Sequence, residues 1–193
     1  MVTAARSRLN MLDAGVSIIE ESMMATEAFL KARSGWNAVI NADAAIREAT
    51  ALAEEMSKEN ILASQAKGNE ALAFLEEAQQ DFSQAEAAYP SLDLAAFKAY
   101  VAKRIESQQA ALAADEAYLS RNKEELEAQN SRYNALEEEA AALAQKLGED
   151  DPEQIVALRF YEEIEADQGA YEAERLKAGN ADAFLREYLG TAS

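Results

Sequence analysis

The sequence predicts an all-α protein, an elongated antiparallel helical bundle with coiled-coil-like hairpins around one long central helix. Composition is the first reason, because 44 of the 193 residues are Ala and 27 are Glu, both strong helix formers, whereas the strand formers Val and Thr are scarce. The second reason is that large apolar residues recur at heptad spacing over long stretches. With only 2 Pro and 7 Gly to interrupt these patterns, we expect a single domain built from a few long helices.

The first predicted helix covers about residues 3–33 and carries a heptad column of apolar side chains. After it, Ser34-Gly35 interrupts the pattern, and either a kink or a full break of the helix fits there. A second helix is expected over about residues 36–56. The heptad column of the first helix, which spans about three repeats, comprises Leu9, Leu12, Val16, Ile19, Met23 and Leu30.

A third helix is expected over residues 60–89. The turn before it is predicted near 57–60 rather than near 68–69, although Gly68-Asn69 also has the composition of a helix end followed by a helix start. Pro90 ends this helix, because proline lacks the amide hydrogen that continues the backbone ladder.

The strongest periodic signal predicts one continuous helix over about residues 92–147, which is the long central helix. A competing interpretation breaks it at Asn122, because Asn122 and Glu125 fit a capping box, and folds the chain into shorter hairpins. Next to the apolar column, polar residues such as Gln108 and Asp115 predict an interior that is partly solvated or paired across helices. The apolar column, spaced by seven throughout, is Ile105, Leu112, Leu119, Leu126, Tyr133, Ala140 and Leu147.

The clearest helix start in the chain lies at Asp151-Pro152. Asp is a favoured N-cap, and Pro is favoured at the first helical position. We therefore expect a helix over residues 152–178, followed by a short helix over residues 181–189 beyond Gly179-Asn180.

The absence of His and Cys excludes several chemistries. The chain has no thiol nucleophile, imidazole base or disulfide, and none of the usual ligand sets for zinc, haem or iron–sulfur clusters. Acidic triplets such as Glu137-Glu138-Glu139 spread over about 200° of a helix, so they are typical of a solvated face rather than a cation site. We expect no metal, no cofactor and no catalytic residue, and hence no enzyme.

The charge balance bears on the partners. With 36 acidic and 18 basic residues the net charge is −18, which disfavours nucleic acid and anionic lipid surfaces. No apolar run reaches the length of a membrane span, and the N-terminus lacks the apolar core of a secretory signal. The sequence as it stands predicts a cytoplasmic protein; an extracytoplasmic or cell-surface location follows if a signal precedes Met1.

Aromatic and amide side chains are the candidate interaction or pocket residues. Trp36, the only Trp, is either an anchor for a partner or a plug at a bundle end. If the last long helix packs against the C-terminal part of the helix before it, three tyrosines share one polar-aromatic seam, which either lines a small-ligand pocket or specifies helix pairing. The candidates are Trp36, Asn122, Gln129, Asn130, Tyr133, Tyr161 and Tyr171.

Two functions remain open from the sequence. The leading hypothesis is a non-enzymatic helical scaffold or adaptor module that associates with a protein partner, or with itself, through uncovered stretches of helix. The alternative is a helical bundle that binds a small ligand or cation in a polar-aromatic pocket around Tyr133, Tyr161 and Tyr171.

Overall fold

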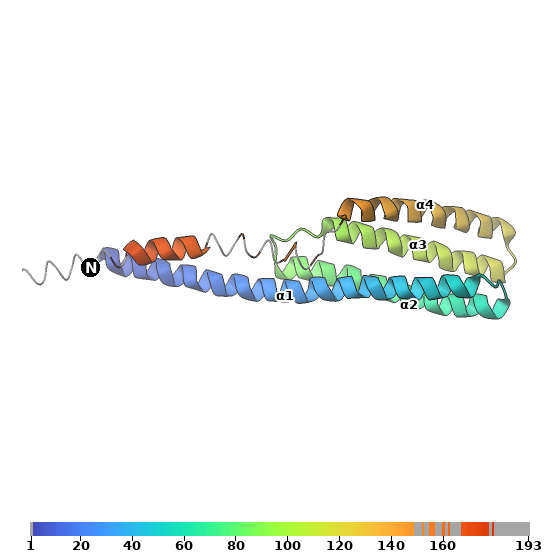
Figure 1. Cartoon of the computed structure of the whole chain (residues 1–193), viewed down its shortest axis with the longest axis horizontal. Helices are drawn as coiled ribbons and strands as arrows, with labels where there is room; N and C mark the ends of the chain where they lie inside the picture. Colours follow the sequence, from blue (N-terminus) through green and yellow to red (C-terminus); the bar gives the residue numbers. More distant parts are fainter. Residues whose placement is uncertain are drawn as a thin grey trace, which may run out of the picture.

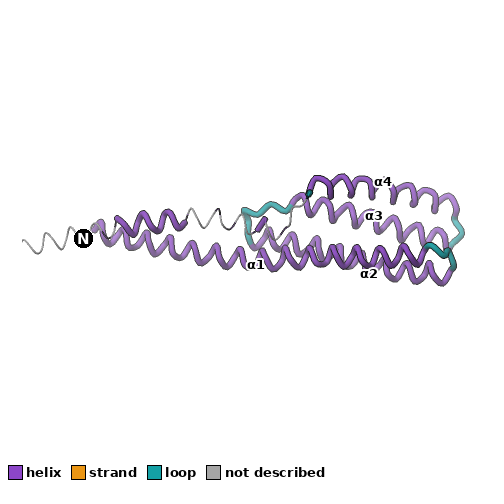
Figure 2. Tube along the Cα trace, in the orientation of Figure 1, coloured by secondary structure: helices purple, strands orange, loops and turns teal. Residues whose placement is uncertain are grey.

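The computed structural model describes residues 2–148 and, beyond them, residues 152, 155, 156, 160, 162, 167–177 and 179. Throughout this described part the regular secondary structure is helical (Figure 2), which confirms the predicted all-α class. The four long helices are α1 (Val2–Ala53), α2 (Lys58–Ala88), α3 (Ala95–Leu119) and α4 (Lys123–Leu147).

The helices form two antiparallel hairpins, α1 with α2 and α3 with α4, which pack through α2 and α3 (Figure 1). Both hairpin turns lie at the same end of the molecule. Since α1 has 52 residues and α2 has 31, α1 is longer by about 30 Å at a rise of about 1.5 Å per residue. The N-terminal part of α1 therefore projects beyond the bundle.

The helical residues 167–177 lie beside this projecting part of α1 (Figure 1). Ser7 and Asn10 of α1 donate hydrogen bonds to the carboxylate of Glu174, which holds the two segments together. These residues fall within the predicted helix 152–178, whereas the predicted short helix 181–189 lies outside the described residues.

Small residues line the contact between α1 and α2. Ala28, Ala32 and Ala42 of α1 are fully buried, and alanine lets two helix backbones approach closely. A Cβ atom on Gly35 would lie 3.0 Å from the Phe82 ring and 3.2 Å from the carbonyl oxygen of Ala78. The predicted break at Gly35 is therefore wrong: residues 3–33 and 36–56 belong to one helix, in which Gly35 makes room for α2.

The predicted continuous helix over residues 92–147 is also wrong, and the alternative break is the one observed. The chain turns at residues 120–122, where Arg121 has a φ of 56°. The Asn122 side chain then accepts a hydrogen bond from the Glu125 amide at 3.2 Å and caps α4. Folding back against α3 buries Leu136 and Ala140. Because α3 and α4 are separate helices, α1 is the longest helix in the described part of the chain.

The remaining predicted boundary was nearly correct. A helix was expected over residues 60–89, and α2 covers Lys58–Ala88. The turn before it lies at residues 54–57, and the Ser57 side chain caps the new helix by accepting from the Asn60 amide at 3.1 Å. Gly68, the rejected turn position, lies inside α2.

Large side chains of the core gather where α1, α2 and α3 meet. Phe82 and Phe97 are almost completely buried, with ring centroids 5.8 Å apart. Trp36 is partly buried and meets Phe97 edge to face at 5.7 Å, so it contributes to this core. Farther along α3, the Arg104 guanidinium forms ion pairs with Asp43 of α1 at 2.6 Å and with Glu137 of α4 at 3.2 Å.

Candidate association surface and interhelical cavity

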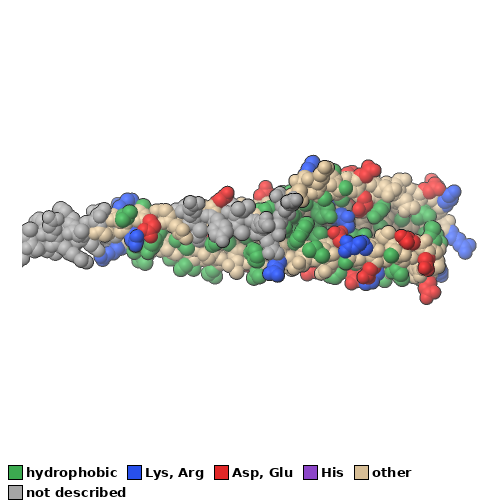
Figure 3. Space-filling model, in the orientation of Figure 1, with side chains coloured by type: hydrophobic (Ala, Val, Ile, Leu, Met, Phe, Trp, Pro, Cys, Tyr) green, Lys and Arg blue, Asp and Glu red, His purple; other side chains and the backbone are tan. Residues whose placement is uncertain are grey.

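An apolar stripe runs along the projecting part of α1. Its six members are each 52–69% exposed, although all are large hydrophobic residues. Hydrophobic side chains are visible along the outer edge of this part of the molecule in Figure 3. The α1 stripe consists of Leu9, Leu12, Val16, Ile19, Met23 and Leu30.

The α1 stripe is the heptad column that the sequence displayed, and it does not form the contact with α2. The face of α1 that packs within the chain is the alanine face around Ala28 and Ala32. Together the six side chains expose roughly 600 Å², at the upper end of the largest apolar patches of monomeric proteins. Ile19, Met23 and Leu30 border one shallow, open part of this helix face.

A cavity of about 280 Å³ lies between the two hairpins, near the end of the bundle that carries the turns. All four long helices contribute to its wall, so it forms only when both hairpins pack together. Its lining comprises Ile46, Ala49, Thr50 and Ala53 of α1, Ser64 of α2, Gln108, Ala111, Ala114 and Asp115 of α3, and Asn130 and Tyr133 of α4.

Among the described residues of this lining, Asp115 is the only formally charged one. Its carboxylate accepts a hydrogen bond from the Ser64 hydroxyl at 3.1 Å, and among the described residues neither Lys nor Arg forms an ion pair with it. Burial raises the pKa of Asp115, and the bond from Ser64 offsets only part of that shift. Burial likewise raises the pKa of Tyr133.

Gln108 is only 4% exposed and lines the same cavity. In the part of the chain that the structure describes, no hydrogen bond to its side-chain amide is found, and its amide atoms are not among the fully enclosed ones that lack a partner, so they remain accessible. Its position depends on Gly68, because a Cβ there would lie 2.7 Å from Gln108 Nε2 and 2.8 Å from Leu112 Cδ2. Gly68 therefore opens the space that the Gln108 amide occupies.

The structure separates the residues that the sequence nominated. Asn130 and Tyr133 line the cavity, and Gln129 lies one residue away on α4. The Gln129 amide donates to Glu125 at 2.7 Å, while its own carbonyl oxygen is buried without a partner among the described residues. Asn122 caps α4.

The expected cluster of three tyrosines is not assembled. Tyr171 belongs to the helical residues beside Asn10, whereas Tyr133 faces the cavity near Ile46. The 36 residues from Asn10 to Ile46 correspond to about 54 Å along α1. Tyr161 lies outside the described residues. Residues 167–177 lie beside the projecting part of α1, which no local pattern in the sequence indicated.

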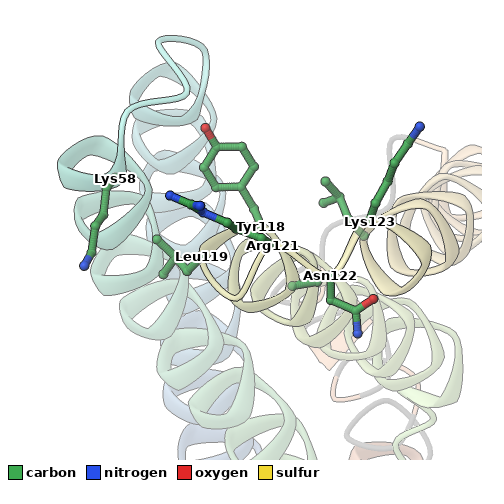
Figure 4. A pocket seen from close by; sticks show the side chains of 8 residues that line it. Lys58, Tyr118, Leu119, Arg121, Asn122 and Lys123 are labelled. Atoms are coloured by element: carbon green, nitrogen blue, oxygen red, sulfur yellow. The ribbon is translucent and has the colours of Figure 1, made fainter.

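A further hollow of about 470 Å³ lies between the hairpin turns. Lys58, Arg121 and Lys123 line it, but the amines of Lys58 and Lys123 point to opposite sides, so the basic groups do not converge (Figure 4). The Tyr118 hydroxyl donates to the Met56 carbonyl oxygen and joins one turn to the other. This hollow reflects the packing of the turns.

The described residues contain no group of three acidic side chains placed to hold a metal ion. None of the helices in this part of the chain is both long enough and apolar enough to cross a membrane. Comparisons with protein-family models, with curated proteins and with solved structures find no match.

Proposed function

We propose that this protein is a non-enzymatic helical scaffold that associates with a second copy of itself through the α1 stripe. The observation that carries the proposal is the heptad spacing of six exposed large apolar residues on one face of α1. Such a column is the pattern by which two helices pack knobs into holes. A second copy offers the same column, so the surface is complementary to itself.

The size of the stripe supports a stable contact. Complete burial of a Leu, Ile, Val or Met side chain contributes about 1.5–3 kcal/mol, and these six are already almost half buried, so each retains about 1–2 kcal/mol. Two copies together gain roughly 12–24 kcal/mol from apolar burial, against a cost of about 4–15 kcal/mol for lost rigid-body freedom. The balance favours association.

The charges beside the stripe favour a parallel arrangement. With Leu9 at heptad position a, the e positions carry Asp13, Glu20 and Glu27, and position g carries Arg8. In a parallel pair, Arg8 faces Asp13 of the second copy, whereas an antiparallel pair brings the acidic e residues of both copies together. Like charges placed opposite each other are destabilising, so the parallel pair is preferred.

The same face of α1 remains exposed beyond the stripe, so the bundle does not obstruct the second copy. The next d position after Leu30 is Arg33, which is exposed. In a parallel pair two Arg33 side chains would meet there and repel each other. We therefore place the end of the contact near Leu30, so that each copy's bundle, which carries the cavity, lies outside the paired helices.

Sedimentation equilibrium on the whole chain tests this proposal. We expect a dimer at micromolar concentration, and a monomer for Ile19→Glu, which places a charge in the centre of the stripe. Leu62→Glu is the matched control, because Leu62 is a similarly exposed apolar residue (49%) on α2, away from the stripe. A monomer at about 1 mM wild-type protein would refute the proposal. Pairing with a basic helix from another protein, while the chain alone stays monomeric, would also contradict it.

Disulfide trapping tests the direction of the helices. The chain contains no Cys, so Leu12→Cys introduces one thiol per copy. In a parallel, in-register pair the two thiols lie opposite each other and should oxidise to a dimer. Efficient dimer formation by a mixture of Leu12→Cys and Met23→Cys, which share an a–d layer only in an antiparallel pair, with none by Leu12→Cys alone, would indicate an antiparallel pair.

A further inference from the structure

We propose that the cavity between the hairpins binds a small organic cation, a primary ammonium held by Asp115 and Gln108. This site is separate from the α1 stripe and does not depend on self-association. Three features of the cavity, taken over the described residues, support it: a mostly buried residue whose amide forms no hydrogen bond, a carboxylate without a paired Lys or Arg, and an aromatic ring at the wall.

The Gln108 amide is the first feature. The Gln108 residue is only 4% exposed and lines the cavity. No described residue forms a hydrogen bond with its side-chain amide. The amide atoms are not fully enclosed, so their hydrogen-bonding groups are available to a molecule in the cavity. Gly68 also leaves space for this amide. A ligand with an N–H donor would satisfy the Gln108 carbonyl oxygen.

Asp115 defines the charge of the ligand. Among the described residues, its carboxylate has the Ser64 hydroxyl as its hydrogen-bond partner, and the described lining contains no Lys or Arg to neutralise it. A positively charged group in the cavity would provide the missing counter-ion and would form a charge-assisted hydrogen bond. A neutral or anionic ligand would leave the carboxylate without a counter-ion.

Tyr133 and the size of the cavity favour an organic cation over a metal ion. Cations are attracted to the face of an aromatic ring, and Tyr133 of α4 forms part of the cavity wall. Calcium takes about 6–8 oxygen ligands and usually several carboxylates, but one carboxylate lines this cavity. The volume of about 280 Å³ is close to the lower limit for small-molecule sites, so it suits a short alkylamine.

Isothermal titration calorimetry with n-butylamine and 1,4-diaminobutane tests the site on the whole chain. We expect saturable binding of at least one amine with a dissociation constant of about 1 mM or lower, and no binding of 1-butanol, the neutral analogue. Asp115→Asn should weaken binding at least about tenfold. Glu116→Gln is the matched control, because this neighbouring acid on α3 is exposed and does not line the cavity.

Gln108→Leu provides a second variant with an opposite pair of effects. Because Leu replaces the amide of a mostly buried residue that forms no hydrogen bond within the described part of the chain, it should raise the melting temperature of the ligand-free protein while weakening amine binding. A purely structural Gln108 would lower the melting temperature when replaced. Ile19→Glu should bind the amine like the wild type, so that failure of this site and failure of self-association are distinguishable.

Several outcomes would overturn the assignment. One is the absence of saturable heat with either amine at about 10 mM. Another is equal binding of 1-butanol, and a third is unchanged affinity in a folded Asp115→Asn variant, checked by circular dichroism.

Discussion

Replacing Gly35 with Ala tests how closely α1 and α2 pack. In an isolated helix this change is favourable, because Ala has less backbone entropy to lose than Gly, by about 0.5–1 kcal/mol. Here the new Cβ would lie 3.0 Å from the Phe82 ring and 3.2 Å from the carbonyl oxygen of Ala78. The Phe82 ring is fully buried and the carbonyl belongs to the backbone of α2, so neither can move without disturbing the core.

The expected magnitude follows from these opposing effects. Inserting a methyl group into a well-packed interface costs about 1–3 kcal/mol, which exceeds the gain in helix propensity. We expect a net loss of about 1–2 kcal/mol and a fall in melting temperature of roughly 2–8 °C for a chain of this length. Gly15→Ala is the control, because nothing lies within 4 Å of a Cβ built there. It should raise the melting temperature by about 1–4 °C.

Thermal denaturation followed by circular dichroism, together with urea unfolding, measures both variants. The urea midpoint should fall for Gly35→Ala and rise for Gly15→Ala, with similar slopes. If Gly35→Ala were as stabilising as Gly15→Ala, the close approach of the two helices at Phe82 would be refuted. In that case the interpretation of Gly35 as a packing residue would also be lost.

Three further predictions concern the polar contacts. Arg104→Met should lower the free energy of unfolding by about 2–4 kcal/mol, because the Arg104 side chain is only 14% exposed and its loss leaves Asp43 and Glu137 without their shared cation. Urea titrations measure this loss, and an unchanged midpoint would contradict the prediction. Asn122→Ala should cost about 0.5–2 kcal/mol through loss of the α4 cap, whereas Asn122→Asp should cost little; equal losses would contradict the capping role. Asp115→Asn should raise the melting temperature at neutral pH. The pKa of Asp115 is higher in the folded than in the unfolded state, so the wild-type protein gains stability as the pH falls from that raised pKa to the ordinary carboxyl pKa. The stability advantage of the Asn variant should therefore shrink over this pH range, which melting curves at several pH values measure.

Local signals in the sequence were sufficient for the helical class and for several helix ends. Pro90 was correctly expected to end the helix that the structure shows as α2, and the Asn122–Glu125 capping box was recognised only as the competing interpretation, although this cap forms between atoms three residues apart. The wrong prediction of one helix over residues 92–147 arose because the apolar column keeps its spacing across the turn at 120–122. The spacing of seven continues from Leu119 at the end of α3 to Leu126 in α4, so periodicity alone did not reveal the break.

The cavity was only partly accessible to prediction. Gln108 and Asp115 stood out as polar residues beside an apolar column, and Asn130 and Tyr133 were nominated directly. Their grouping depends on the packing of two hairpins, since Ser64 and Asp115 are separated by 51 positions in the sequence. In the sequence, Gly68 indicated only a possible turn. Its approach to Gln108 arises only when α2 and α3 pack, so it could not be predicted.

The sequence by itself determined that the chain is helical, that it is strongly acidic, and that α1 carries a heptad column of large apolar residues. Only the tertiary structure decided which face of α1 points inward. The alanine face around Ala28 and Gly35 allows α2 to approach closely. At this short distance more atoms of the two helices come into contact than the larger side chains of the α1 stripe would allow. For that reason Leu9 and the other members of the α1 stripe remain on the surface.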